Sequence, residues 1–221
     1  MPAKEMAWPK QPSDRQWITP EGDDPRTLYQ MLMVSQEMFG EEPCFGYIPS
    51  PGMQRMHLTY NEFGNLSTAV AKGLRDIGVE KGDRVAIILD NSVEWAALSY
   101  GANALGAAYT AMYTHQHGKD WAFILGDATP KTVAVQNTEV LDKLCDALDD
   151  DAWPESGIIL LGEDPANKLP PEGVTVRSWI ELVQAGRAGD DLAEIADDPT
   201  ALSTLIYTSG TTGNPKGVML S

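Results

Sequence analysis

The sequence is short of cysteine, of basic residues and of long apolar runs. Its 221 residues include two cysteines, Cys44 and Cys145, which excludes a disulfide framework and indicates a reducing compartment. Sixteen Lys and Arg against 32 Asp and Glu give a net charge of -16, which argues against nucleic acid or an anionic membrane as a partner, because both require basic patches. No apolar run approaches the roughly 20 residues of a membrane helix. The polar N-terminus is no secretory signal, so we expect a cytoplasmic protein without a membrane span.

Apolar residues, by contrast, are plentiful. They make up 43% of the chain, enough for a sizeable core in one large domain or two small ones. Residues 1–26 carry prolines at positions 2, 9, 12, 20 and 25, and we expect them to form an extended arm. We assign residues 27–221 to a single domain.

The apolar pattern alternates between helical and strand periods along residues 27–221. Spacings of three or four predict helices, and short apolar runs predict strands. The predicted helices are 27–39, 60–77, 92–105, 119–125, 139–148 and 179–185, and the predicted strands are 44–48, 53–58, 84–89, 109–113, 132–135 and 157–161. An acidic connector is expected over 186–199. Strands that alternate with helices indicate an α/β fold with a mostly parallel sheet flanked by helices.

The most informative stretch lies at the end of the chain. Between Leu202 and Ser221 the only charged side chain is Lys216, and an anion is favoured there in an otherwise acidic protein. Glycines at 210, 213 and 217 allow close backbone approach, and hydroxyl donors stand at 208, 209, 211 and 212. This composition predicts a loop that binds polyphosphate.

The loop is not of the Walker type. A Walker loop has glycine, four residues and then Gly-Lys-Ser/Thr at the start of a helix. Counted from Gly210, the second glycine position holds Pro215, and Gly217 follows Lys216. The β-rich runs 202–207 and 218–220 on either side predict that the loop joins two strands.

The uninterrupted string Tyr-Thr-Ser-Gly-Thr-Thr-Gly-Asn-Pro-Lys-Gly, residues 207–217, resembles the AMP-binding signature of the adenylate-forming superfamily. That superfamily contains acyl-CoA synthetases, luciferases and nonribosomal peptide adenylation domains. Segments 57–63, 82–86 and 104–109 follow the order of the family's N-terminal region, so the resemblance covers about 45–221. It is nearest to long- or medium-chain fatty acyl-CoA synthetases.

The resemblance implies specific roles for the loop. The residues it implies as ligands of the β- and γ-phosphates are Thr208, Ser209, Gly210, Thr211, Thr212, Gly213 and Lys216. Lys216 would also neutralise the charge that develops on pyrophosphate. The implied reaction joins a carboxylic acid, here a fatty acid, to the α-phosphate of ATP and then transfers the acyl group to coenzyme A. ATP, Mg²⁺ and coenzyme A are the implied cofactors.

The family's downstream motifs are missing from the sequence. The signature is usually followed by a histidine and later by an aromatic-Gly-x-Thr-Glu segment, an aspartate for the ribose and a C-terminal lysine. We therefore expect an N-terminal fragment of an acid–thiol ligase, truncated after the phosphate loop and inactive at this length. Its sheet would have an open edge prone to association.

Other interpretations remain open. The chain could be a non-catalytic protein that binds nucleotide or acyl groups, the adenylation domain of another branch (peptide synthetase or fatty acyl-AMP ligase), or an unrelated P-loop kinase. His115 and His117 could ligate a metal and Asp149–Asp151 could bind Mg²⁺, although a surface histidine pair and a solvated helix end are favoured. The sequence indicates no metal site and no oligomeric state.

Overall fold

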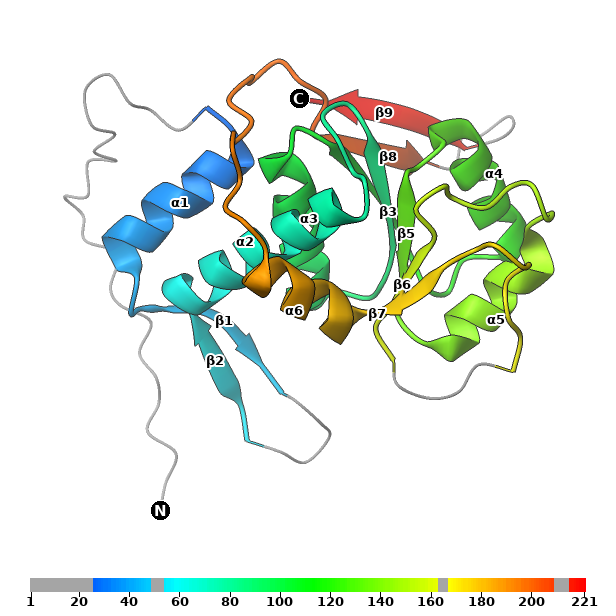
Figure 1. Ribbon diagram of the computed structural model, residues 1–221, viewed down its shortest axis with the longest axis horizontal. Coiled ribbons are helices and arrows are strands. Elements are labelled where there is room, and N and C mark those ends of the chain that lie inside the picture. Colours follow the sequence, from blue (N-terminus) through cyan, green and yellow to red (C-terminus); the bar gives the residue numbers. More distant parts are fainter. Residues whose placement is uncertain (1–25, 49–53, 163–166, 209–214) are drawn as a thin grey trace.

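The computed structural model describes residues 26–48, 54–162, 167–208 and 215–221 (Figure 1). The predicted arm therefore lies almost wholly outside the described residues. The helices are α1 (Leu28–Phe39), α2 (Tyr60–Asp76), α3 (Val93–Ala104), α4 (Gly118–Ala128), α5 (Thr138–Ala147) and α6 (Trp179–Ala188). The strands are β1 (Pro43–Tyr47), β2 (Met56–Thr59), β3 (Arg84–Ile88), β4 (Ala108–Met112), β5 (Thr132–Val135), β6 (Ile158–Leu160), β7 (Val176–Ser178), β8 (Thr204–Thr208) and β9 (Lys216–Leu220).

A seven-stranded sheet forms the centre of the molecule, in the order β7-β6-β5-β3-β4-β8-β9. Its first six strands are parallel, and β9 joins β8 in the antiparallel sense. The predicted α/β fold with a mostly parallel sheet is confirmed. A separate antiparallel pair, β1 and β2, projects below the helices in Figure 1.

Helices cover both faces of this sheet, which explains the uninterrupted apolar run of β3. Val85 and Ile87 belong to the apolar cluster that includes residues of α2, α3 and α6. Ala86 and Ile88 belong to the cluster on the other face, with residues of α4 and α5. Because successive strand residues point to opposite faces, a strand that is covered twice must be apolar at every position.

Hydrogen bonds from side chains fix the starts of the helices. Thr59 accepts a hydrogen bond from the Glu62 amide, and the Glu62 carboxylate accepts one from the Thr59 amide, so the two residues form a capping box. Ser178 and Glu181 make the same pair of bonds at α6. Ser92 caps α3 by accepting from the amide of Trp95.

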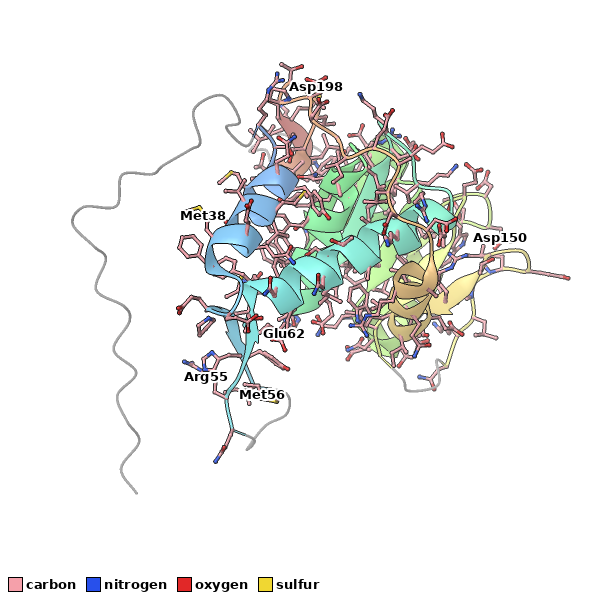
Figure 2. The ribbon with its side chains drawn as sticks, turned by 60° about the vertical axis from the view of Figure 1, so that its left-hand side comes forward. Met38, Arg55, Met56, Glu62, Asp150 and Asp198 are labelled. Carbon is pink, nitrogen blue, oxygen red and sulfur yellow. The ribbon has the colours of Figure 1, made fainter. Side chains whose placement is uncertain are left out.

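Helix α1 and the β1–β2 pair lie toward the left of the molecule in Figure 1. Figure 2 brings α1 and α2 forward, with Met38 on α1, Glu62 at the start of α2 and Met56 on β2. Met38 is 55% exposed and Met56 is 51% exposed. These methionines therefore contribute little to the core that holds the sheet.

Local structure differs from the predictions in several places. The helix expected over 119–125 continues to Ala128. β7 was not predicted, because its three residues include Arg177 and carry no apolar alternation. The helix expected to end at Ala185 continues to Ala188, so the acidic connector begins at Gly189. Gly186 lies inside α6 because it packs against the backbone of α2, which compensates for its low helix propensity.

Candidate functional site

The predicted phosphate loop connects two strands that pair directly with each other. β8 and β9 are antiparallel, and Thr208 lies opposite Lys216 in their register. Residues 209–214, which include the predicted ligands Ser209, Gly210, Thr211, Thr212 and Gly213, lie outside the described residues. The structure therefore fixes the two ends of the loop, Thr208 and Lys216, side by side.

This arrangement excludes a Walker-type loop. Lys216 is the first residue of strand β9, and Gly217 and Val218 continue that strand opposite Tyr207 and Ile206. A Walker loop requires a helix directly after its lysine. The P-loop kinase interpretation is therefore wrong.

The base of the β8–β9 pair is attached to β4. Tyr109 and Thr110 of β4 pair with Thr204 and Leu205 of β8 in a parallel register. The Thr204 hydroxyl donates to the Tyr109 carbonyl at 3.0 Å, and the Thr110 hydroxyl donates to the Leu205 carbonyl at 3.1 Å. Since parallel strands end at the same edge of a sheet, Thr208 at the end of β8 lies at the edge where β4 ends.

Lys216 is available to an anion. Its side chain is exposed, and none of the ion pairs found in the described part of the chain includes it. Thr208 is also exposed and adds a hydroxyl beside it. A polyphosphate at this place would meet a cation that has no acidic partner among the described residues.

A polar network that sequence reasoning missed lies at the ends of β3, β4 and β5. Asp90 accepts a hydrogen bond from the Thr114 hydroxyl at 2.6 Å and one from the Gln136 side-chain amide at 3.2 Å. The Asp90 backbone amide donates to the Gln136 side-chain oxygen at 2.7 Å. The hydrogen bond from Thr114 is the main cause that lowers the pKa of Asp90 below its ordinary value. A polar residue within two positions of the end of each buried strand is the signal that would have found this network.

Tyr207 makes a second contact that the sequence does not indicate. Its hydroxyl donates to the carboxylate of Asp127, on the last turn of α4, at 2.6 Å. Burial of the ring, followed by the hydrogen bond to Asp127, raises the pKa of Tyr207 above its ordinary value. The hydroxyl therefore stays protonated at neutral pH and acts as the donor.

The alternative metal sites receive no support from the geometry. His115 and His117 lie in the exposed turn before α4, and Asp149–Asp151 are exposed after α5, with Asp150 labelled in Figure 2. In the described part of the chain, no three His, Cys, Asp or Glu side chains come together as a metal site would require.

Among the described helices, none has the length and apolar character to cross a membrane.

Comparison with known proteins identifies relatives over most of the chain. Long-chain-fatty-acid–CoA ligase ACSBG1 of Bos taurus is 29% identical over 205 residues, which cover 89% of this chain and 27% of that protein. ACSBG2 of Xenopus laevis, another long-chain-fatty-acid–CoA ligase, is 29% identical over 201 residues, or 89% of this chain and 26% of that protein. The chain thus spans about a quarter of the length of these curated relatives.

Solved structures agree with this relationship. The fatty acyl CoA synthetase of Mycobacterium tuberculosis superimposes with a TM-score of 0.65 at 26% identity, over 89% of this chain and 34% of that one. The anthranilate CoA ligase AuaEII, solved with anthranoyl-AMP, gives 0.71 at 22% identity over 87% of this chain and 34% of that one, which shows a shared fold. The family model described as AMP-binding enzyme matches residues 35–221. The chain therefore belongs to the AMP-binding enzyme family, and the curated relatives named above are long-chain-fatty-acid–CoA ligases.

Proposed function

We propose that this chain supplies the phosphate-binding part of an enzyme that activates a fatty acid with ATP and transfers it to coenzyme A. The observation that carries the proposal is the position of Lys216. It faces Thr208 across the β8–β9 pair at the ends of the Gly- and Thr-rich loop, exposed and without a described ion pair. The long-chain-fatty-acid–CoA ligase relatives support a fatty acid as the substrate.

The proposed chemistry has two steps. The carboxylate of the acid attacks the α-phosphorus of ATP and forms an acyl-adenylate, and pyrophosphate leaves. The thiolate of coenzyme A then attacks the acyl carbonyl, which forms the thioester and releases AMP. The protein's task in the first step is to hold the triphosphate and to neutralise the charge that grows on pyrophosphate.

In this proposal Thr208 and Lys216 bind the β- and γ-phosphates, together with Ser209, Gly210, Thr211, Thr212 and Gly213. Mg²⁺, when bound with ATP, supplies further neutralisation of phosphate charge. A charge-assisted hydrogen bond is stronger than a neutral one, so the ammonium group of Lys216 is the largest single contribution we assign to this loop. We place the enzyme in the cytoplasm.

The chain spans 27% of the length of the ACSBG1 relative, so we assign the complete reaction to a protein of that length. We expect the 221-residue polypeptide to bind MgATP without forming acyl-CoA. In a protein of the relatives' length, fatty-acid-dependent exchange of pyrophosphate into ATP would test the first step, and acyl-CoA formation would test the second. Exchange that requires an amino acid instead would identify a peptide-synthetase branch.

Calorimetric titration of the 221-residue chain with MgATP tests the role of the loop directly. Lys216→Ala should raise the Kd about 10- to 100-fold, the loss expected for one charge-assisted hydrogen bond. Lys81→Ala is the matched control, because Lys81 is an exposed lysine in the turn that precedes β3 and does not belong to the β8–β9 pair. Equal effects of the two substitutions would show that only net charge matters and would contradict the proposal.

A further inference from the structure

The base of the β8–β9 pair is paired with β4, and its tip is not. Its register with β4 ends at Thr110 and Leu205. Beyond that point lies the tip, which we define as residues 206–208 and 216–218. Within the described residues, the Tyr207–Asp127 hydrogen bond is the only side-chain hydrogen bond that links the tip to the rest of the molecule.

The ring of Tyr207 is placed to make this link. Tyr207 pairs with Gly217, and a Cβ atom at Gly217 would lie 3.0 Å from the Tyr207 Cζ atom. The glycine therefore lets the ring lie close against β9. The ring also packs against the apolar cluster formed by α4, α5 and the facing strand residues, and its hydroxyl reaches the end of α4.

The position of Asp127 is otherwise unfavourable. It lies in the last turn of α4, where the helix dipole disfavours a negative charge, and that turn has no basic residue of its own. The guanidinium group of Arg84 caps the same helix end by donating to the carbonyls of Ala128 and Thr129 at 2.7 and 2.8 Å. Arg84 thus caps this helix end, and the bond from Tyr207 is the only hydrogen bond found for the Asp127 carboxylate in the described part of the chain.

We infer that Asp127 is a positioning residue, which acts through Tyr207 to hold the tip of the β8–β9 pair and thereby the two ends of the phosphate loop. The inferred effect of Asp127 on ligand binding rests on the proposed function. The attachment of the tip to Asp127 through Tyr207 does not depend on that function. Thr208 and Lys216 both belong to the tip. Loss of the Tyr207–Asp127 hydrogen bond would let these two residues move away from the positions that binding of a triphosphate requires.

Hydrogen exchange measured by mass spectrometry tests the attachment without any ligand. Tyr207→Phe keeps the ring and removes the donor, and Asp127→Ala removes the acceptor. Each should speed exchange of the amides in 206–208 and 216–218 roughly tenfold, the effect of one lost hydrogen bond to a charged group. The double variant should show no more than either single variant, because both remove the same bond.

Tyr29→Phe is the matched control, since the Tyr29 hydroxyl bonds to the Thr68 hydroxyl at 2.8 Å, between α1 and α2. It should leave exchange of the tip unchanged. Asp127→Asn retains an acceptor oxygen and should restore much of the protection lost in Asp127→Ala. Unchanged exchange of the tip in both Tyr207→Phe and Asp127→Ala would overturn the inference.

Titration with MgATP then separates the two proposals. We expect Asp127→Ala to raise the Kd about three- to tenfold while the melting temperature stays close to that of the wild type. If the wild-type chain binds no MgATP, the proposed function fails and the exchange result still decides whether Asp127 holds the tip. Faster exchange with unchanged MgATP affinity would overturn the positioning role of Asp127 in binding.

Discussion

Replacement of Gly186 by alanine should destabilise the protein because two helix backbones meet at this residue. A Cβ atom built on Gly186 would lie 1.8 Å from the Ala69 carbonyl oxygen and 2.8 Å from the Gly73 nitrogen, both backbone atoms of α2. Ordinary van der Waals contact begins at 3.4 Å. No change of side-chain rotamer relieves a clash with a backbone, so α6 must move away from α2.

The expected loss of stability depends on the core residues that are displaced when α6 moves away from α2. Leu182 and Val183 of α6 are 2% and 7% exposed, in the apolar cluster shared with α2 and the sheet. Overpacking of a core costs about 1 to 3 kcal/mol, and a rigid backbone contact belongs at the upper end. Alanine regains up to about 1 kcal/mol of helix propensity. The net loss should be about 2 kcal/mol, or roughly 4 to 8 °C in melting temperature for a chain of this size.

Gly126→Ala is the matched control, because Gly126 is an exposed residue inside α4 and a Cβ atom there would meet nothing within 4 Å. The same substitution should therefore stabilise the protein by about 0.5 to 1 kcal/mol. Urea unfolding followed by circular dichroism measures both variants. If Gly186→Ala proved as stable as Gly126→Ala, the close contact of α2 and α6 would be refuted.

Two further predictions concern the polar network and the sheet edge. Thr114→Val removes the main hydrogen bond that lowers the pKa of Asp90, so NMR titration should show a higher pKa. Wild type should be more stable than this variant above about pH 4, and the difference should be lost as the pH falls through the lowered pKa of Asp90. A difference in stability that does not change with pH would show that the hydrogen bond to Asp90 is not its cause. Met219→Lys places a charge on the open edge strand β9, where Met219 is 72% exposed. It should reduce self-association in sedimentation velocity at high protein concentration, and unchanged association would show that this edge is not the contact.

Much of the fold was predictable because local signals agreed with the tertiary structure. The run 84–89 predicted a strand, which the structure has over Arg84–Ile88, and the helix predicted over 60–77 begins at Tyr60 as expected. Strand β5 matches its predicted bounds, 132–135. β7 could not be predicted, because its three residues, Val-Arg-Ser, show neither an apolar run nor an apolar alternation. They form a strand through their pairing with β6.

The candidate site was predictable only where its residues are neighbours in the sequence. The loop from Thr208 to Lys216 is one continuous string, and its flanking strands are confirmed. Asp127 contacts Tyr207 across 80 positions of sequence, and as an exposed acid in an acidic chain it carried no local signal. The assignment of the loop residues to phosphate binding remains a prediction.

The order of the strands is consistent with the place of the proposed site. β3 and β4 are neighbours, yet the helices that follow them, α3 and α4, pack on opposite faces of the sheet. The loops after these strands therefore diverge, and in open α/β sheets ligands bind at such a point, outside the carboxyl ends of the strands. β8 lies beside β4 and ends at Thr208. The carboxylate of Asp90 at this edge accepts hydrogen bonds from Thr114 and Gln136, and the ammonium group of Lys216 is the positive charge that our proposal offers to a polyphosphate.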